Sequence, residues 1–316
     1  MEFIIIGSII LILLAATLAF TCVAFRMTFY SPKNRKENYY HFPKGSDFEC
    51  AKESMSGLIK ALENTPCEDV EITSFDGLKL RGRYYHYKDG APVQIQFHGY
   101  RGTAFRDLCG GSQMARDLGF NTILVDQRAH GKSEGTTITF GANERFDCLS
   151  WINYAIKRFG DDVVIYISGV SMGATTVLMA SGLDLPSNVK GVFADCPFSS
   201  PEAIIKKTCR DMGVSPKIAF PFLRLGARLF GRFNVRSADA IEAVKSAKIP
   251  ILLIHGDTDT IVPCKMSKEI YESNPDKITF EVFPNAGHGM SYIVDTDRYL
   301  KLLHEFFDKC ENNIAV

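Results

Sequence analysis

The chain has 316 residues, of which 46% are hydrophobic and 23% charged, and 36 Lys and Arg residues balance 36 Asp and Glu residues. This length suits one large α/β domain or two small ones, and the apolar fraction supports a sizeable core. The composition excludes a disordered chain, and the neutral net charge excludes a broad basic surface for nucleic acid.

The first 30 residues differ from the rest. Residues 3–25 contain no charged side chain and would measure about 35 Å as a helix, enough to cross a bilayer core of roughly 30 Å. A cleaved signal peptide is the alternative, but it would have a basic start and a shorter apolar run, whereas Glu2 precedes this one. We predict a retained single-pass membrane anchor over residues 1–30.

Basic residues follow the uncharged run 3–25 closely, and they are Arg26, Lys33, Arg35 and Lys36. The positive-inside tendency then predicts that the rest of the chain lies on the cytoplasmic side. Residues 31–68 are polar with a helical middle that ends before Thr65-Pro66, which indicates a helical stalk packed on the following domain.

A domain with alternating strands and helices is predicted over residues 69–316. Two alternating runs, 70–75 and 78–87, flank Asp76-Gly77, a dipeptide typical of a tight hairpin turn. Continuous apolar runs bounded by Gly, Asp or Pro predict strands buried on both faces. These runs are 93–97, 122–125, 163–167, 189–194, 251–254 and 278–283. We therefore expect an α/β fold with a mostly parallel eight-stranded sheet and helices on both faces.

The interval between the runs 189–194 and 251–254 exceeds fifty residues, where a crossover between parallel strands needs about a dozen or more. Its apolar clusters and prolines predict a small helical insertion over about 198–245. A lid over the carboxyl edge of the sheet and an ordinary packed insertion fit equally well.

The nine cysteines form no CxxC pair or Cys/His metal spacing, so we interpret them as mostly buried thiols in a reducing compartment, with no metal site.

A nucleophile motif lies between a strand and a helix. Gly169-Val170-Ser171-Met172-Gly173 matches G-x-S-x-G, with the run 163–167 before it and small helical residues after it. In this motif a sharp turn exposes the serine hydroxyl at the sheet edge. Ser171 is therefore the candidate nucleophile, and a histidine must accept its proton while a carboxylate orients that histidine.

Chain order selects the partners of Ser171. The order in this arrangement is serine, then acid, then histidine, so only His288 and His304 lie late enough in the chain to follow an acid after Ser171. His304 falls in an amphipathic helical run, whereas His288 lies in a Gly-flanked loop directly after the run 278–283, so we choose His288. For the acid, Asp257 and Asp259 follow the run 251–254; Asp257 could instead bind its own turn. Asp195 is a third candidate.

Two backbone amides are expected to stabilise the oxyanion: Met172 N–H after the nucleophile and, in the loop 98–102, Tyr100 N–H. His98 is interpreted as a loop-organising residue. The segment 126–131 also contains Asp, Arg and His, but without an adjacent nucleophile we interpret it as turn and ion-pair scaffolding.

Together these motifs resemble bacterial membrane-anchored α/β-hydrolases of the serine aminopeptidase/monoacylglycerol-lipase-like group. The resemblance covers about residues 68–312 and rests on segments around Asp76-Gly77, His98-Gly99, 126–133, 169–173, 255–263 and Gly287-His288-Gly289. In that group the acid is the aspartate shortly before Val-Pro, which favours Asp259 over Asp257. The resemblance implies an α/β-hydrolase fold and leaves the acyl group open.

We therefore predict a serine hydrolase that cleaves carboxylic esters through an acyl-enzyme on Ser171, with no cofactor or metal. The expected partners are a small-molecule acyl ester, which the anchor allows to be a lipid, and the membrane. An aminopeptidase, thioesterase or acyltransferase with the same triad is the alternative. A non-catalytic scaffold is disfavoured because each catalytic role has a candidate residue.

Overall fold

The computed structural model describes residues 1–33, 38–42, 48 and 51–312. Arg35, Lys36 and Cys50 lie outside the described residues, as does part of the predicted stalk. Within the stalk the structure places helix α3 at Lys52–Glu63, which buries Ile59 and Leu62 against the domain. The eight cysteines that the structure describes are free, and five of them are buried.

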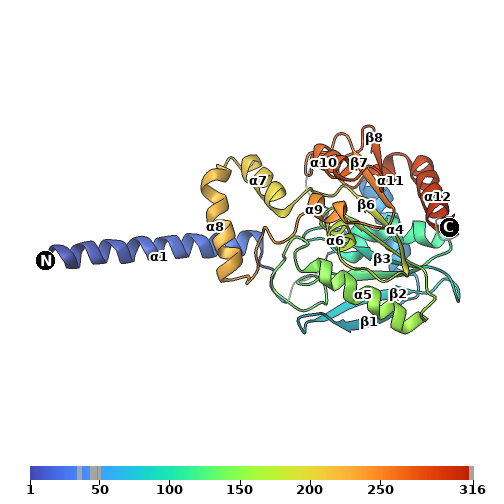
Figure 1. The fold of residues 1–316 in the computed structure, drawn as a ribbon, viewed down its shortest axis with the longest axis horizontal. Helices are drawn as coiled ribbons and strands as arrows, with labels where there is room; N and C mark the ends of the chain where they lie inside the picture. Colours follow the sequence, from blue (N-terminus) through green and yellow to red (C-terminus); the bar gives the residue numbers. More distant parts are fainter. Residues whose placement is uncertain (34–37, 43–47, 49–50, 313–316) are drawn as a thin grey trace.

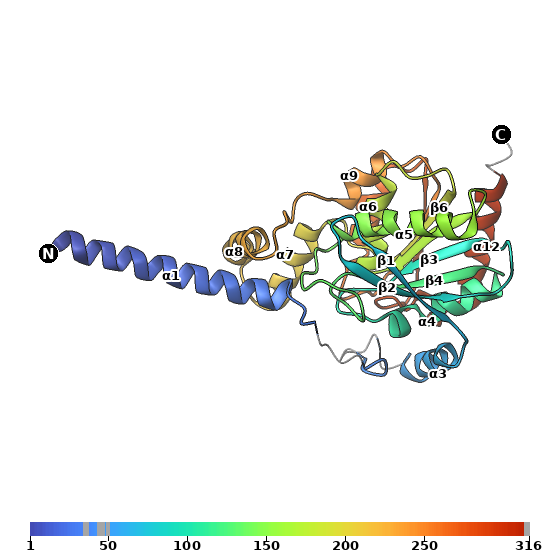
Figure 2. The same cartoon turned by 90° about the horizontal axis from the view of Figure 1, so that it is seen from below.

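Helix α1, Glu2–Thr28, projects from one side of the domain (Figures 1 and 2). Among the described helices it is the one with the length and hydropathy to cross a bilayer. Its residues up to Phe20 are exposed, whereas Thr21 and Phe25 are buried, and Phe29 just beyond the helix is fully buried. Phe25 and Phe29 belong to the main hydrophobic core. The last turns of α1 are thus part of the folded domain.

Eight strands form one sheet in the order β1-β2-β4-β3-β5-β6-β7-β8. The pairs β1·β2 and β2·β4 are antiparallel and the other pairs are parallel. The strands are β1 Glu68–Thr73, β2 Lys79–Tyr85, β3 Val93–Phe97, β4 Asn121–Asp126, β5 Ile165–Val170, β6 Val189–Asp195, β7 Ile251–Gly256 and β8 Ile278–Phe283. The predicted mostly parallel eight-stranded sheet is confirmed, and Gly77 makes the β1–β2 turn with φ +90°.

Helices cover both faces of the sheet because neighbouring strand residues point to opposite sides. Ile165 and Ile167 of β5 join one core, whereas Tyr166 between them joins the other. The first face carries α5 Glu144–Phe159, α6 Met172–Ser181, α9 Ala240–Lys245 and α10 Lys265–Ser273. The second carries α3, α4 Ala104–Asp117 and α12 Thr296–Asn312, preceded by the short α11 Ser291–Val294.

The long interval between β6 and β7 contains α7 Pro201–Asp211 and α8 Pro216–Leu229 before α9. Helix α8 lies across α1, on the side of the domain from which α1 projects (Figures 1 and 2). Proline stands in the first turn of both α7 and α8, where its fixed φ and missing N–H suit a helix start. Whether this insertion acts as a lid stays a prediction.

A buried ion-pair cluster ties the first hairpin to α5. Arg128, after β4, donates from Nε and Nη2 to the carboxylate of Asp147 at 2.6 and 2.7 Å. Its guanidinium also pairs with Asp76 in the hairpin turn, at 2.9 Å. The side chains of Arg128 and Asp147 are 4% and 3% exposed. The segment 126–131 therefore has the ion-pair scaffolding that its sequence suggested.

Arg128→Ala should lower the free energy of unfolding by about 3–5 kcal/mol, because it leaves the Asp147 carboxylate buried without its partner. Arg158→Ala is the matched control, since Arg158 pairs at 2.7 Å with a Glu68 side chain that is 58% exposed, and such a pair contributes about 0–1 kcal/mol. Urea unfolding of both variants measures the difference. Equal losses would contradict the assignment of Arg128 to a buried cluster.

Candidate active site

The candidate nucleophile occupies a strained turn between β5 and α6. Ser171 has φ 56° and ψ −117°, a conformation that L-residues rarely adopt and that is typical of functional turns. Its N–H donates to Asp195 O on the neighbouring strand at 2.8 Å. A Cβ on Gly169 would lie 2.4 Å from Gly173 C, and one on Gly173 would lie 2.0 Å from Phe97 O. Both glycines are therefore needed for strand and helix to approach so closely.

The structure brings the three predicted triad residues together. Ser171 Oγ lies 3.0 Å from His288 Nε2, and His288 Nδ1 lies 2.7 Å from Asp259 Oδ2. Because the carboxylate only accepts, Nδ1 carries the proton in the neutral ring and Nε2 is left to accept from the serine hydroxyl. The arrangement has the geometry of a nucleophile, a base and an orienting acid.

Electrostatics support the same division of roles. Burial on its own lowers the pKa of His288, but the charge of Asp259 and its hydrogen bond outweigh burial and leave the pKa above its ordinary value. Burial on its own raises the pKa of Asp259, but His288 and the hydrogen bonds from His255 and His288 hold it well below its ordinary value. Asp259 therefore stays ionised and stabilises the imidazolium.

Asp259 is held by more than His288. Its Oδ1 accepts from the N–H groups of Ile261 and Val262 at 2.9 and 2.8 Å. The fully buried His255 places Nε2 3.1 Å from Asp259 Oδ2 and 2.8 Å from Val262 O. Both are acceptors, so Nε2–H donates to them, while Ser267 Oγ lies 2.6 Å from Nδ1. This role of His255 was not predicted from the sequence, where the residue stands at the end of a buried strand and within the segment 255–263 of the family resemblance.

The other carboxylate candidates make different contacts. Asp257 is exposed and accepts from Asn285 N–H at 2.7 Å, which ties it to the loop before His288. Asp195 is buried and accepts from Tyr299 Oη at 2.8 Å. Burial raises the pKa of Asp195 to about 6, although Tyr299 opposes the shift. Of the three acids, the geometry links Asp259 to His288.

The loop between β3 and α4 lies beside the nucleophile. A Cβ on Gly99 would be 3.5 Å from Ser171 Cβ, while Gly99 N–H already donates to Asp107 at 3.0 Å. The neighbouring Tyr100 donates its hydroxyl to Thr28 O at 2.8 Å, and Met172 begins α6 directly after Ser171. This placement supports, as a proposal, an oxyanion site formed by the N–H groups of Tyr100 and Met172.

Two other histidines organise this loop. His98 is fully buried, with Nδ1 2.8 Å from Gly99 O, and its Nε2 accepts from Gln127 N–H at 3.1 Å. His130 Nε2 accepts from Arg101 N–H at 3.0 Å. Burial lowers the pKa of His98 and keeps it neutral. His304 is exposed on α12.

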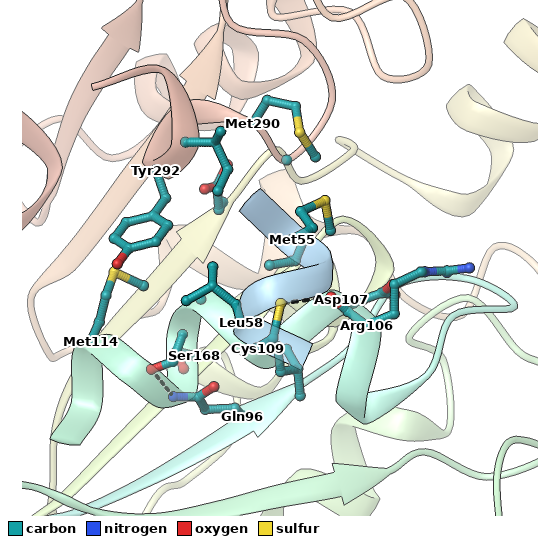
Figure 3. A pocket seen from close by; sticks show the side chains of 18 of the residues that line it. Met55, Leu58, Gln96, Arg106, Asp107, Cys109, Met114, Ser168, Met290 and Tyr292 are labelled. Carbon is teal, nitrogen blue, oxygen red and sulfur yellow. Dashed lines mark hydrogen bonds and ion pairs between the residues drawn. The ribbon is translucent and has the colours of Figure 1, made fainter. Parts of the chain in front are cut away.

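Two features near the triad bear on metal binding and hydration. Ligand atoms of Cys196, Asp259 and His288 lie within 4.8 Å of one another, but burial raises the pKa of the Cys196 thiol well above its ordinary value, and a neutral thiol is a poor metal ligand. Behind the site, a cavity of about 60 Å³ is enclosed partly by Met55 and Tyr292 (Figure 3). Asp195 Oδ1 and Gln96 Oε1 in its lining have no partner among the described residues, so the cavity is suited to bound water.

The sheet order, the turn at Ser171 and the serine–histidine–aspartate arrangement define an α/β-hydrolase fold, as the sequence predicted. The family model described as alpha/beta hydrolase fold matches residues 97–212. The solved structure of the Pyrococcus furiosus esterase Pf2001 superposes with a TM-score of 0.66 at 22% identity, covering 89% of this chain and 98% of that one. Est1E from Butyrivibrio proteoclasticus superposes with a TM-score of 0.57 at 21% identity, covering 78% and 100%.

Sequence relatives extend the similarity. The Bacillus subtilis protein YqkD is 26% identical over 78% of this chain and 82% of its own length. The lysophosphatidylserine lipase ABHD12 of Danio rerio is 24% identical over 70% of this chain, and the match spans 59% of the lipase. The Danio rerio relative has a lipase name and the Pyrococcus furiosus structure has an esterase name, whereas the narrower resemblance to a membrane-anchored bacterial group stays a prediction.

Labelling by a fluorophosphonate probe should report the activated serine. We expect Ser171→Ala to abolish labelling of the full-length protein, and Asp259→Asn to slow it by about 10²-fold or more, because the histidine loses its orienting carboxylate. Asp257→Asn removes a neighbouring carboxylate of the same loop and should leave the rate nearly unchanged. A slower rate in Asp257→Asn with normal labelling in Asp259→Asn would reverse the assignment.

Proposed function

We propose that the protein is a serine hydrolase that cleaves carboxylic esters through an acyl-enzyme on Ser171. The observation that carries this proposal is the hydrogen-bond chain from Ser171 Oγ through His288 to Asp259, at 3.0 and 2.7 Å. A serine hydroxyl is a poor nucleophile at neutral pH, and this chain supplies the base that activates it.

In the proposed reaction, Ser171 Oγ attacks the ester carbonyl while His288 Nε2 takes the hydroxyl proton. The N–H groups of Met172 and Tyr100 stabilise the oxyanion, and His288 then protonates the departing alcohol. Water, activated by the same imidazole, hydrolyses the acyl-enzyme and releases the acid. Asp259 remains ionised throughout and stabilises the imidazolium formed in each step.

A lipid ester is the substrate class that we favour. The esterase names of the solved structures and the lysophosphatidylserine lipase name of a relative support an ester substrate. A protein named thiohydrolase aneE is 27% identical over 44% of this chain, and it makes thioester cleavage by the same acyl-enzyme the second candidate. Aminopeptidase and acyltransferase activity would use the same three residues.

We further propose that α1 is a retained membrane anchor with the domain on the cytoplasmic side. Removal of the segment as a signal peptide would take away Thr21 and Phe25, which are 0% and 6% exposed in the domain. Arg26 and Lys33 follow the apolar run, and their charge favours the cytoplasmic face.

A panel of p-nitrophenyl esters, a lysophospholipid, an acyl thioester and an aminoacyl anilide tests the reaction class. We expect the full-length protein to hydrolyse esters, and Ser171→Ala to lower kcat by about 10⁴-fold or more. Ser168→Ala, which removes another buried serine of β5, is the control and should retain activity. Turnover of the anilide but of no ester would replace the esterase proposal with a peptidase.

The pH dependence of kcat/KM should show the state of His288. His288 accepts a proton only when neutral, so activity is lost as pH falls through its pKa, which Asp259 raises above the ordinary value of about 6.5. We expect an acidic limb above about pH 6.5, and Asp259→Asn should move that limb to lower pH. Measurement on a soluble ester from pH 4 to 10 gives the shift. A limb that stays at the same pH in Asp259→Asn would show that another group titrates.

A further inference from the structure

We propose that α8 is a second membrane contact, an interfacial helix that inserts one apolar face into the bilayer surface and binds anionic phospholipid headgroups with its basic side chains. This inference rests on the proposed anchoring by α1, and it is independent of the proposed ester hydrolysis.

The position of α8 relative to α1 is the first observation. Helix α8 crosses α1 where α1 leaves the domain: a Cβ on Gly226 would lie 3.0 Å from both Thr21 O and Phe25 Cβ. The exposed residues of α1 before this crossing, 2–20, extend about 28 Å as helix, close to a bilayer core of roughly 30 Å. An α1 that spans the bilayer therefore places α8 at its surface.

An exposed apolar stripe on α8 faces the free part of α1. Ile218, Phe222, Leu225 and Leu229 follow one another at intervals of four, three and four residues, so they lie on one side of the helix. Three of them are 65%, 39% and 52% exposed, in the order Ile218, Leu225 and Leu229. Phe222 packs against Phe20 with ring centroids 4.9 Å apart, and Phe20 lies on the projecting side of the crossing. The stripe is thus directed toward the membrane, while Ala219, Phe220 and Leu223 are buried behind it.

The basic residues around α8 indicate that the membrane surface it binds is anionic. Residues 212–238 contain five basic residues and no acidic one, in a chain whose net charge is zero. They are Lys217, Arg224, Arg228, Arg232 and Arg236. Within the described residues, Arg236 pairs with Glu202. Lys217 also borders an open hollow of about 500 Å³ at the α7–α8 junction, together with Lys206 and Arg210. An apolar stripe flanked by cations is the pattern of helices that lie in the interface of anionic membranes.

This placement also brings the catalytic edge to the membrane. Tyr100 donates to Thr28 O, and Arg101 donates to Met27 O at 2.8 Å, so the loop beside Ser171 is attached to the same end of α1. With α1 and α8 both engaged, the domain has two separate contacts with the bilayer and a fixed tilt, and the loop near the nucleophile faces the lipid surface.

Tryptophan quenching by lipids brominated on the acyl chain tests the proposal on the full-length protein in phosphatidylcholine–phosphatidylglycerol vesicles. The single native Trp151 is fully buried in the core and gives the background. We expect Leu225→Trp to emit at shorter wavelength than an exposed tryptophan and to lose intensity in brominated lipid. Tyr87→Trp is the matched control, since Tyr87 is 51% exposed and its N–H bonds Asn121 at the amino end of β4. It should not be quenched.

Leu11→Trp in the free part of α1 distinguishes a failure of the α8 contact from a failure of the α1 anchor. Quenching of Leu11→Trp without quenching of Leu225→Trp would overturn the interfacial role of α8 while leaving the anchor intact. No quenching at either position would overturn both. Emission of Leu225→Trp at short wavelength without bromine quenching would show that a protein partner or a second copy covers the stripe, and this too overturns the proposal. Activity on a soluble ester is measured separately and enters none of these outcomes.

A comparison of two lipid mixtures tests the headgroup contact separately. Quenching of Leu225→Trp should decrease in vesicles of phosphatidylcholine alone, and the substitutions Lys217→Gln, Arg224→Gln and Arg228→Gln together should abolish the difference between the two lipid mixtures. Equal quenching in both mixtures before these substitutions would overturn the anionic headgroup contact.

Discussion

The carboxylate of Asp259 is removed from solvent and is nonetheless ionised, and the rest of the candidate site depends on how this charge is compensated. Four donors reach it, from the backbone of Ile261 and Val262 and from the rings of His255 and His288. Burial of a carboxylate is costly unless such hydrogen bonds replace water. The compensation fixes the carboxylate, the carboxylate fixes the tautomer of His288, and the correct tautomer presents Nε2 to Ser171. His255 acts on the reacting atoms through Asp259 and is therefore a positioning residue.

The N-terminal helix is a structural part of the domain as well as a candidate anchor. Phe25 and Phe29 lie in the main core, and Phe29 contacts the rings of Phe140 and Phe233. Phe140 in turn stacks on Tyr100 at 4.9 Å between ring centroids. A continuous set of aromatic contacts therefore joins the C-terminal end of α1 to the loop beside the nucleophile. In a site whose geometry must hold within fractions of an ångström, such packing limits the movement of that loop.

Strain and rigidity are combined at the nucleophile. The positive φ of Ser171 and of the neighbouring Cys196, at 56° and 48°, would each be unfavourable in a flexible segment. Here both residues follow buried parallel strands, and the hydrogen bonds of Ser171 N–H to Asp195 O and Cys196 N–H to Ile254 O hold them in place. The sheet thus holds the half-buried Ser171 at its edge in this strained conformation.

Local patterns in the sequence were enough to predict the fold class, the eight strands, the hairpin at Asp76-Gly77 and the turn that carries Ser171. These features follow from short-range causes, namely the alternation of apolar residues, the conformational freedom of glycine and the order of strand, serine and helix. His288 also emerged from chain order, because few histidines follow the nucleophile. The residues alone left Asp257 and Asp259 open, since both follow the same strand. The family resemblance favoured Asp259, and the folded loop places that carboxylate against the imidazole. Tertiary structure likewise decided three further features: the burial of Phe25, the support of Asp259 by His255 and the position of α8 across α1. Each depends on contacts between segments far apart in the chain or on the direction in which a helix packs, and hydrophobic periodicity specifies neither.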